Sequence, residues 1–161
     1  MTGNETKEPI EKGEQALPIR DQIRLLVEEQ PFAVLCMQGE GQPYGSIVSY
    51  AISDDLVSVI FCTSVNTRKY RLLCENDRVA LVIDSRPRQP DQIMDAAALT
   101  ATGQAVEIPR GPERAQLAKL LASRHAKIAS FIADPSTALF RIKVNQYVYV
   151  TRFQKVHTWY P

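Results

Sequence analysis

The chain of 161 residues has the length of a single domain that can bury a hydrophobic core. Its formal net charge of +1 does not indicate a nucleic-acid surface or a polybasic membrane patch. Hydrophobic residues make up 45% of the sequence, yet no apolar run is long enough to span a bilayer, and the polar N-terminus lacks the apolar segment of a signal peptide. We therefore expect a cytoplasmic protein without nucleic-acid or membrane partners.

The N-terminal segment differs in composition from the rest of the chain. Residues 1–16 are rich in Gly, Glu, Lys and Thr and contain almost no large apolar side chains, which predicts a disordered leader. A single folded domain is expected over residues 17–161. Apolar residues recur at helical spacing from residue 19 to residue 29, and Pro31 ends this helix.

The first half of the domain is predicted to form an antiparallel meander of three strands. Two apolar segments, residues 32–37 and 44–52, flank residues 39–42, whose glycines favour a tight hairpin turn. A polar turn at residues 53–55 leads to the third strand, residues 56–62, which is rich in β-branched and aromatic side chains.

The second half adds strands and helices in alternation. Strands are predicted over residues 78–84, 96–108, 138–144 and 147–153, with residues 156–160 pairing beside them, and helices over residues 70–76, 113–124 and 128–132. Pro87 and Pro90 predict a loop, and Gly103 indicates a β-bulge. The order of strands and helices along the chain predicts a mainly β fold. We expect a small closed antiparallel barrel of six to eight strands with flanking helices. Because residues 80–83 are apolar on both faces, we expect a helix or a second subunit to cover that strand.

The cysteines and histidines do not indicate a metal or catalytic centre. Cys36, Cys62 and Cys74 match no zinc-binding spacing, and reduced, buried thiols are expected. No side chain forms a recognisable acid–base or nucleophile–base pair, so no catalytic residue is assigned.

The junction between the third strand and the following helix, residues 63–69, carries the main functional signal. Asn66 or Thr67 is expected to cap the helix. Arg68 and Lys69 fall in the first helical turn, where the helix dipole disfavours cations. An anion held by the free backbone N–H groups, the threonine hydroxyls and these two cations would reverse that cost, which indicates a phosphate site. The alternative interpretation is an ordinary solvated pair of surface cations.

A specific sequence pattern surrounds this junction. Phe61-Cys62-Thr63-Ser64 is followed after two residues by Thr67-Arg68-Lys69, and the next strand opens with Arg78-Val79-Ala80-Leu81. With these motifs the chain resembles, over residues 19–160, the FMN-binding split-barrel superfamily of pyridoxine 5′-phosphate oxidase. Its later half, at residues 99–105 and 138–142, is most similar to the branch that contains haem-degrading split-barrel proteins.

The resemblance implies a split β-barrel that binds FMN. Thr67, Arg68 and Lys69 would hold the FMN phosphate, and Cys62 and Thr63 would touch the flavin. The backbone of the second strand would lie along the isoalloxazine ring through Ser46, Ile47, Val48 and Ser49. The resemblance also implies a homodimer with the cofactor at the subunit interface and a small-molecule substrate.

The residues that define the substrate of the oxidases are replaced in this chain. Ser46 stands where the oxidases carry an arginine, and Ala98 stands where they carry a glutamine. The oxidases end in a basic tail, whereas the last residues here, Trp159-Tyr160-Pro161, include no arginine. The leading hypothesis is therefore an FMN-binding oxidoreductase or flavin reductase whose substrate is not pyridoxine phosphate. The alternatives are a haem-binding or haem-degrading protein, with His157 as the nearest candidate ligand, and a non-catalytic binding module on the same barrel.

Overall fold

The computed structural model describes residues 17–86, 90–152 and 155–161. The strands are β1 (Phe32–Gly39), β2 (Gln42–Ile52), β3 (Ser58–Ser64), β4 (Arg78–Asp84), β5 (Ala97–Glu107), β6 (Thr137–Thr151) and β7 (Lys155–Trp159). The α-helices are α1 (Ile19–Glu29), α2 (Arg68–Glu75), α3 (Pro112–Arg124) and α4 (Ala129–Ala133), and two short 3-10 helices are η1 (Pro90–Asp95) and η2 (Ala126–Ile128). The leader predicted for residues 1–16 lies outside the described residues.

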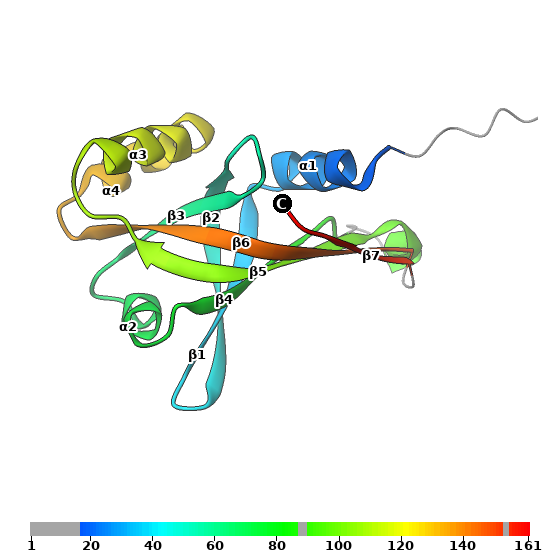
Figure 1. Ribbon diagram of the computed structural model, residues 1–161, viewed down its shortest axis with the longest axis horizontal. Coiled ribbons are helices and arrows are strands. Elements are labelled where there is room, and N and C mark those ends of the chain that lie inside the picture. Colours follow the sequence, from blue (N-terminus) through cyan, green and yellow to red (C-terminus); the bar gives the residue numbers. More distant parts are fainter. Residues whose placement is uncertain (1–16, 87–89, 153–154) are drawn as a thin grey trace, which may run out of the picture.

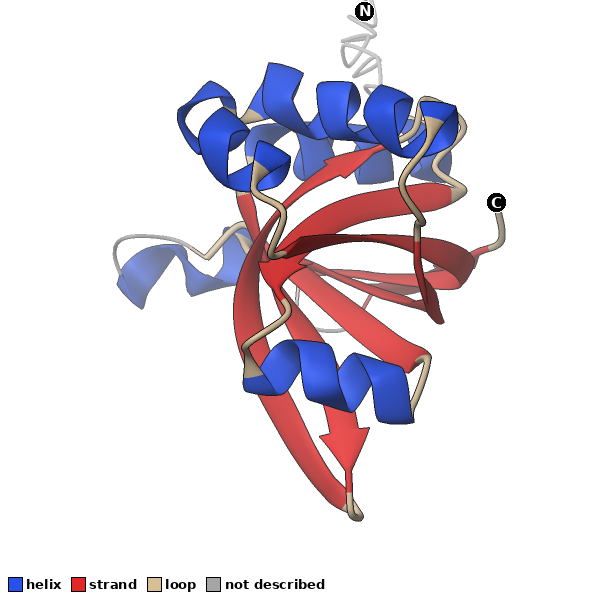
Figure 2. Ribbon diagram, turned by 90° about the vertical axis from the view of Figure 1, so that its left-hand side faces the viewer, coloured by secondary structure: helices blue, strands red, loops and turns tan. Residues whose placement is uncertain are grey.

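The strands form an antiparallel barrel with one added strand. Neighbouring strands follow the order β3-β2-β1-β4-β5-β6-β7, and a further pairing between β3 and β6 closes the barrel. Helices α1, α3 and α4 lie on one side of the strands and α2 on the other (Figures 1 and 2). The predicted mainly β barrel with flanking helices is thus confirmed. Within the described residues, no helix is both long enough and apolar enough to cross a membrane.

Strand β6 differs from the sequence prediction, which placed two strands on either side of Asn145 and Gln146. The structure has one continuous strand, so that prediction is wrong. Gln146 lies opposite Thr102 and Val144 lies opposite Gly103, which leaves Asn145 as an extra residue in the ladder. The β-bulge expected at Gly103 is confirmed. It accommodates Asn145 within the ladder, so the polar residues Asn145 and Gln146 do not interrupt the strand.

Two apolar clusters hold the elements together. The larger one fills the barrel with side chains from alternate strand positions, among them Leu35, Val48, Phe61, Leu81, Leu99, Phe140 and Tyr147. The smaller one lies outside the barrel wall, between the strands and helices α3 and α4, and consists of Ala51, Ile60, Leu121, Ile132 and Leu139. This second cluster fixes α4 against β3 and β6, beside the candidate site described below.

The C-terminal end of α1 is held by side chains from other elements. The Tyr50 hydroxyl lies 2.8 Å from the carbonyl oxygens of both Val27 and Gln30. The Arg124 guanidinium donates to the Gln30 carbonyl at 2.7 Å and stacks 4.7 Å from the centre of the Tyr50 ring. These contacts satisfy carbonyls that a helix end leaves without partners.

We expect Arg124→Ala to lower the free energy of unfolding by about 1–3 kcal/mol, because partly buried carbonyls at the end of α1 lose a charged donor. Urea denaturation of the purified protein measures the change. Arg71→Ala is the matched control, since Arg71 is exposed and its side chain forms, among the described residues, a single long ion pair of 3.9 Å with Glu75. Equal effects of the two substitutions would contradict the prediction.

Candidate functional site

A cavity of about 370 Å³ lies where β2 and β3 separate. The two strands pair only over residues 50–52 and 59–61. Within the described residues, the part of β2 before Tyr50 pairs with β1 alone and has a free edge on the side of β3. The cavity is lined by Ile47, Val48, Ser49, Cys62, Thr63, Ser64, Thr67, Lys69, Ile128 and Phe131.

The structure brings most of the site residues predicted from the sequence to this one cavity. Seven of the nine line it: Ile47, Val48, Ser49, Cys62, Thr63, Thr67 and Lys69. Ser46 precedes them in β2 but is not a lining residue. Arg68 is exposed, and its guanidinium lies 4.6 Å from the centre of the Tyr44 ring instead of lining the cavity. The two cations therefore lie in different environments, Lys69 at the cavity and Arg68 over the Tyr44 ring.

One end of the cavity is polar and sits at the start of α2. Of the two candidate caps, Thr67 occupies the capping position, and its side-chain oxygen accepts from the backbone N–H of Tyr70 at 3.1 Å. The Thr67 hydroxyl also lies 3.0 Å from the hydroxyl of Thr63. The first backbone N–H groups of α2, those of Arg68 and Lys69, have no acceptor within the described residues, as is usual at a helix start. This end can therefore donate several hydrogen bonds to an anion.

Lys69 adds a positive charge to the polar end. Its ammonium donates to the Ile47 carbonyl at 3.3 Å, on the free edge of β2. Burial lowers the pKa of this ammonium from its ordinary value, because removal from water disfavours the charged form. No carboxylate forms an ion pair with Lys69 in the described part of the chain. A half-buried cation without a carboxylate partner favours a bound anion.

Cys62 contributes a neutral thiol to the cavity wall. Burial raises its pKa to about 11, although the charges of Lys69 and Arg114 oppose the shift. The thiol is therefore protonated at neutral pH and is a poor nucleophile. Cys62 and Cys36 are half-buried, whereas Cys74 is exposed. The expected burial of Cys74 is wrong, because α2 buries its leucines at positions 72 and 73 instead.

Iodoacetamide at pH 8 is expected to modify Cys74 well before Cys62. The thiolate is the reacting form, so the rate at Cys62 should keep rising with pH until about pH 11, where its pKa lies. Peptide mass analysis after timed alkylation measures both rates. Fast modification of Cys62 at pH 7 would show instead that its thiol is ionised.

Ile128 and Phe131 are lining residues that the sequence did not indicate. They come from η2 and α4, far along the chain from the junction at residues 63–69. The sequence predicted a helical turn over residues 128–132 but carried no signal that one of its faces meets the β2–β3 split. Together with Ile47, these side chains add an apolar part to the lining of the cavity.

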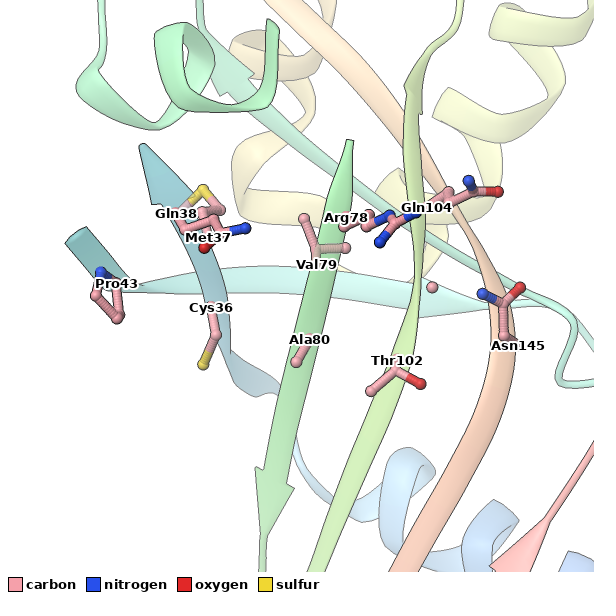
Figure 3. Close-up of a pocket in the computed structure, with 11 residues that line it drawn as sticks. Cys36, Met37, Gln38, Pro43, Arg78, Val79, Ala80, Thr102, Gln104 and Asn145 are labelled. Carbon is pink, nitrogen blue, oxygen red and sulfur yellow. The ribbon is translucent and has the colours of Figure 1, made fainter. Parts of the chain in front are cut away.

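Larger cavities lie elsewhere, two of them of about 580 Å³ and 1070 Å³. The smaller of these two opens over β1, β4, β5 and β6, where Figure 3 shows Arg78, Gln104 and Asn145 on three strands beside it. The other includes Arg152 and His157 among its lining residues. Neither contains a site residue predicted at the 63–69 junction.

Comparison with known protein families identifies one that matches most of this chain. The family model described as "Pyridoxamine 5′-phosphate oxidase" matches residues 19–151. The chain belongs to the pyridoxamine 5′-phosphate oxidase family. This match includes the β2–β3 split, the 63–69 junction and α4, so the resemblance inferred from the sequence motifs is confirmed at the level of family and fold. No curated protein gives a significant match.

Solved structures share the fold at low sequence identity. A haem-binding protein from Mycobacterium smegmatis is 18% identical with a TM-score of 0.79, covering 91% of this chain and 59% of that one. HutZ from Vibrio cholerae, described as a haem storage protein, is 18% identical with a TM-score of 0.71, covering 84% and 96%. An FAD-binding protein from Mesorhizobium loti is 18% identical with a TM-score of 0.65, covering 81% and 90%. The chain thus spans 59% of the mycobacterial protein, and these likenesses show the fold alone.

Proposed function

We propose that this family member is an FMN-binding flavoprotein, an oxidoreductase or flavin reductase with a small-molecule substrate. The observation that carries the proposal is the cavity at the β2–β3 split, whose lining combines a cation and hydroxyl groups with apolar side chains. FMN has the two matching parts, a charged phosphate and a broad aromatic ring. The cavity volume of about 370 Å³ falls within the range of about 300–1,000 Å³ typical of small-molecule sites.

The polar end suits the phosphate. The Lys69 ammonium supplies charge, and the free N–H groups at the start of α2 supply directed donors. Binding of a phosphate there also removes the electrostatic cost of two cations in the first turn of α2. Arg68 would contribute its charge from its position over the Tyr44 ring.

The free edge of β2 suits the rim of the flavin ring. Ile47 and Ser49 line the cavity on a stretch of backbone that, among the strands described, pairs with β1 alone. Backbone N–H and C=O groups without a strand partner can bind the polar rim of the isoalloxazine. When bound, FMN would supply the redox chemistry, and the residues of this chain would bind it and orient its ring.

We also propose that the chain works as a homodimer. Neighbouring side chains on the outer faces of β1, β4, β5 and β6 remain half-buried in the single chain: Val34, Cys36, Ala80, Val82, Thr100, Thr102 and Val148. The cavity in Figure 3 opens over part of this face. A contiguous, weakly polar sheet face is typical of a subunit interface. Sedimentation should then give about twice the chain mass of 18.1 kDa.

Haem is the second candidate ligand. The haem-binding and haem storage proteins match with higher TM-scores, 0.79 and 0.71, than the FAD-binding protein, at 0.65. His157 lines the cavity of about 1070 Å³ together with Arg152 and Lys155, so an imidazole and two cations surround a space of suitable size. His125 is less suited as a ligand, because its Nε2 lies 2.8 Å from the Tyr50 carbonyl.

Titration of the purified protein with FMN and with hemin tests both candidates. The proposal expects saturable binding of one FMN per chain, seen as a shift of the flavin absorbance band. A hemin Soret band that disappears in His157→Ala, together with no binding of FMN, would overturn it in favour of haem. Binding of neither ligand would favour a non-catalytic module.

A further inference from the structure

We propose that Phe131 of α4 packs against the flavin ring and forms the aromatic wall of the site. The inference rests on the proposed FMN binding and adds a ring-binding residue that lies outside the motif at residues 63–69. It also assigns a role to α4, which the phosphate site alone does not use.

The first argument is the exposure of apolar side chains at the cavity. Phe131 keeps 40% of its surface exposed and Ile47 keeps 68%, although both are large hydrophobic residues. Both line the same cavity, together with the half-buried Ile128. Exposed apolar side chains that gather around one cavity mark a binding surface, because a ligand then removes them from water.

The second argument is that α4 holds Phe131 in place. Its next residue, Ile132, is only 6% exposed and packs in the cluster with Ile60 and Leu139. The end of α4 is fixed by Asp134, whose carboxylate accepts from the Ser136 backbone N–H at 2.7 Å. A side chain positioned before the ligand arrives binds it with a smaller entropic cost.

The third argument is that two other aromatic residues, Trp159 and Tyr70, already pack against other rings. Trp159 lies against Tyr147 with 5.8 Å between ring centres. Tyr70 lies edge-on to Phe140, and its hydroxyl donates to Glu107 at 3.0 Å. Within the described residues, Phe131 is the aromatic side chain that lines the cavity. It can therefore meet a planar ring by stacking or by an edge-to-face contact.

The experiment compares FMN with riboflavin, which has the same ring and no phosphate. Fluorescence titrations are run on the full-length protein and on the variants Phe131→Ala, Phe131→Leu and Lys69→Ala. Leu120→Ala is the control, because Leu120 is an apolar residue of α3 that is 37% exposed and does not line the cavity. Circular dichroism melting curves of each variant confirm that it is folded.

Phe131→Ala is expected to weaken binding of FMN and riboflavin by the same factor, about tenfold, because both lose the ring contact. Phe131→Leu should lose less affinity for the two flavins than Phe131→Ala. Leu120→Ala should bind both flavins like the unaltered protein. Lys69→Ala should weaken FMN alone, because riboflavin offers no phosphate.

The outcomes separate the inference from the function on which it rests. Binding of both flavins by Phe131→Ala as tightly as by the unaltered protein would overturn the role of Phe131 and leave the FMN site standing. Failure of the unaltered protein to bind either flavin would overturn the proposed function and the inference with it.

Discussion

The double substitution Arg68→Ala with Lys69→Ala is expected to weaken FMN binding by about 3–5 kcal/mol, since a hydrogen bond from a charged group contributes about 1.5–3 kcal/mol. Lys69 should account for the larger share. Its ammonium lines the cavity and is half-buried, whereas Arg68 is exposed over the Tyr44 ring, where water and salt screen its charge. Of the two single variants, Lys69→Ala should therefore bind FMN more weakly than Arg68→Ala.

Isothermal titration with FMN at two salt concentrations measures these effects. At low salt each single variant should bind FMN more weakly than the unaltered protein. Higher salt should reduce this loss of affinity more for Arg68→Ala than for Lys69→Ala. Arg71→Ala is the matched control, because Arg71 lies one turn further along the same helix and is exposed. A double variant that binds FMN with unchanged affinity would remove the phosphate assignment.

Gly103→Ala is expected to destabilise the fold by about 3 kcal/mol or more, the upper part of the range for overpacked sites. A Cβ atom at Gly103 would lie 2.2 Å from the Lys143 carbonyl oxygen and 2.9 Å from its carbonyl carbon. Both are backbone atoms of β6, so relief requires the two strands to move apart. The clash sits at the bulge that sets the register between β5 and β6.

The midpoint of urea denaturation gives the change in stability. Gly45→Ala is the matched strand control, because a Cβ atom there would meet only the Val34 side chain at 3.4 Å, an ordinary contact. We expect Gly45→Ala to remain near the stability of the unaltered protein. If the two variants unfold at the same urea concentration, the close approach of β5 and β6 at Gly103 does not limit stability, and the prediction is wrong.

Local patterns in the sequence accounted for most elements of the fold. The strand at Arg78–Asp84 agrees with its prediction at both ends, because alternating apolar residues and flanking polar ones define it over a few positions. The hairpin turn lies where the sequence predicts it, and Gly41 has the expected positive φ angle, although Glu40 rather than Gly39 supplies the second one. The cap at Thr67 was likewise one of two adjacent candidates, since a hydroxyl before a helix start needs no distant partner.

The errors arose where the outcome depended on segments distant in the sequence. Asn145 and Gln146 were interpreted as a break, yet three partner strands along β6 supply enough pairing to carry the chain through a bulge. Cys74 was expected to be buried, but the side of α2 that packs on the barrel is set by how the helix docks. A pattern of eight residues leaves that docking angle open.

The sequence by itself determined the barrel, the family and the hydroxyl-rich, basic junction at residues 63–69, because periodicity, turn chemistry and a contiguous motif are local properties. Only the tertiary structure decided which side chains share the cavity. The β2–β3 split brings Lys69 beside Ile47, the docking of α4 adds Phe131, and the Tyr44 ring holds Arg68 apart. These contacts join segments that are far apart along the chain, and their distances follow from strand register and core packing rather than from any local pattern.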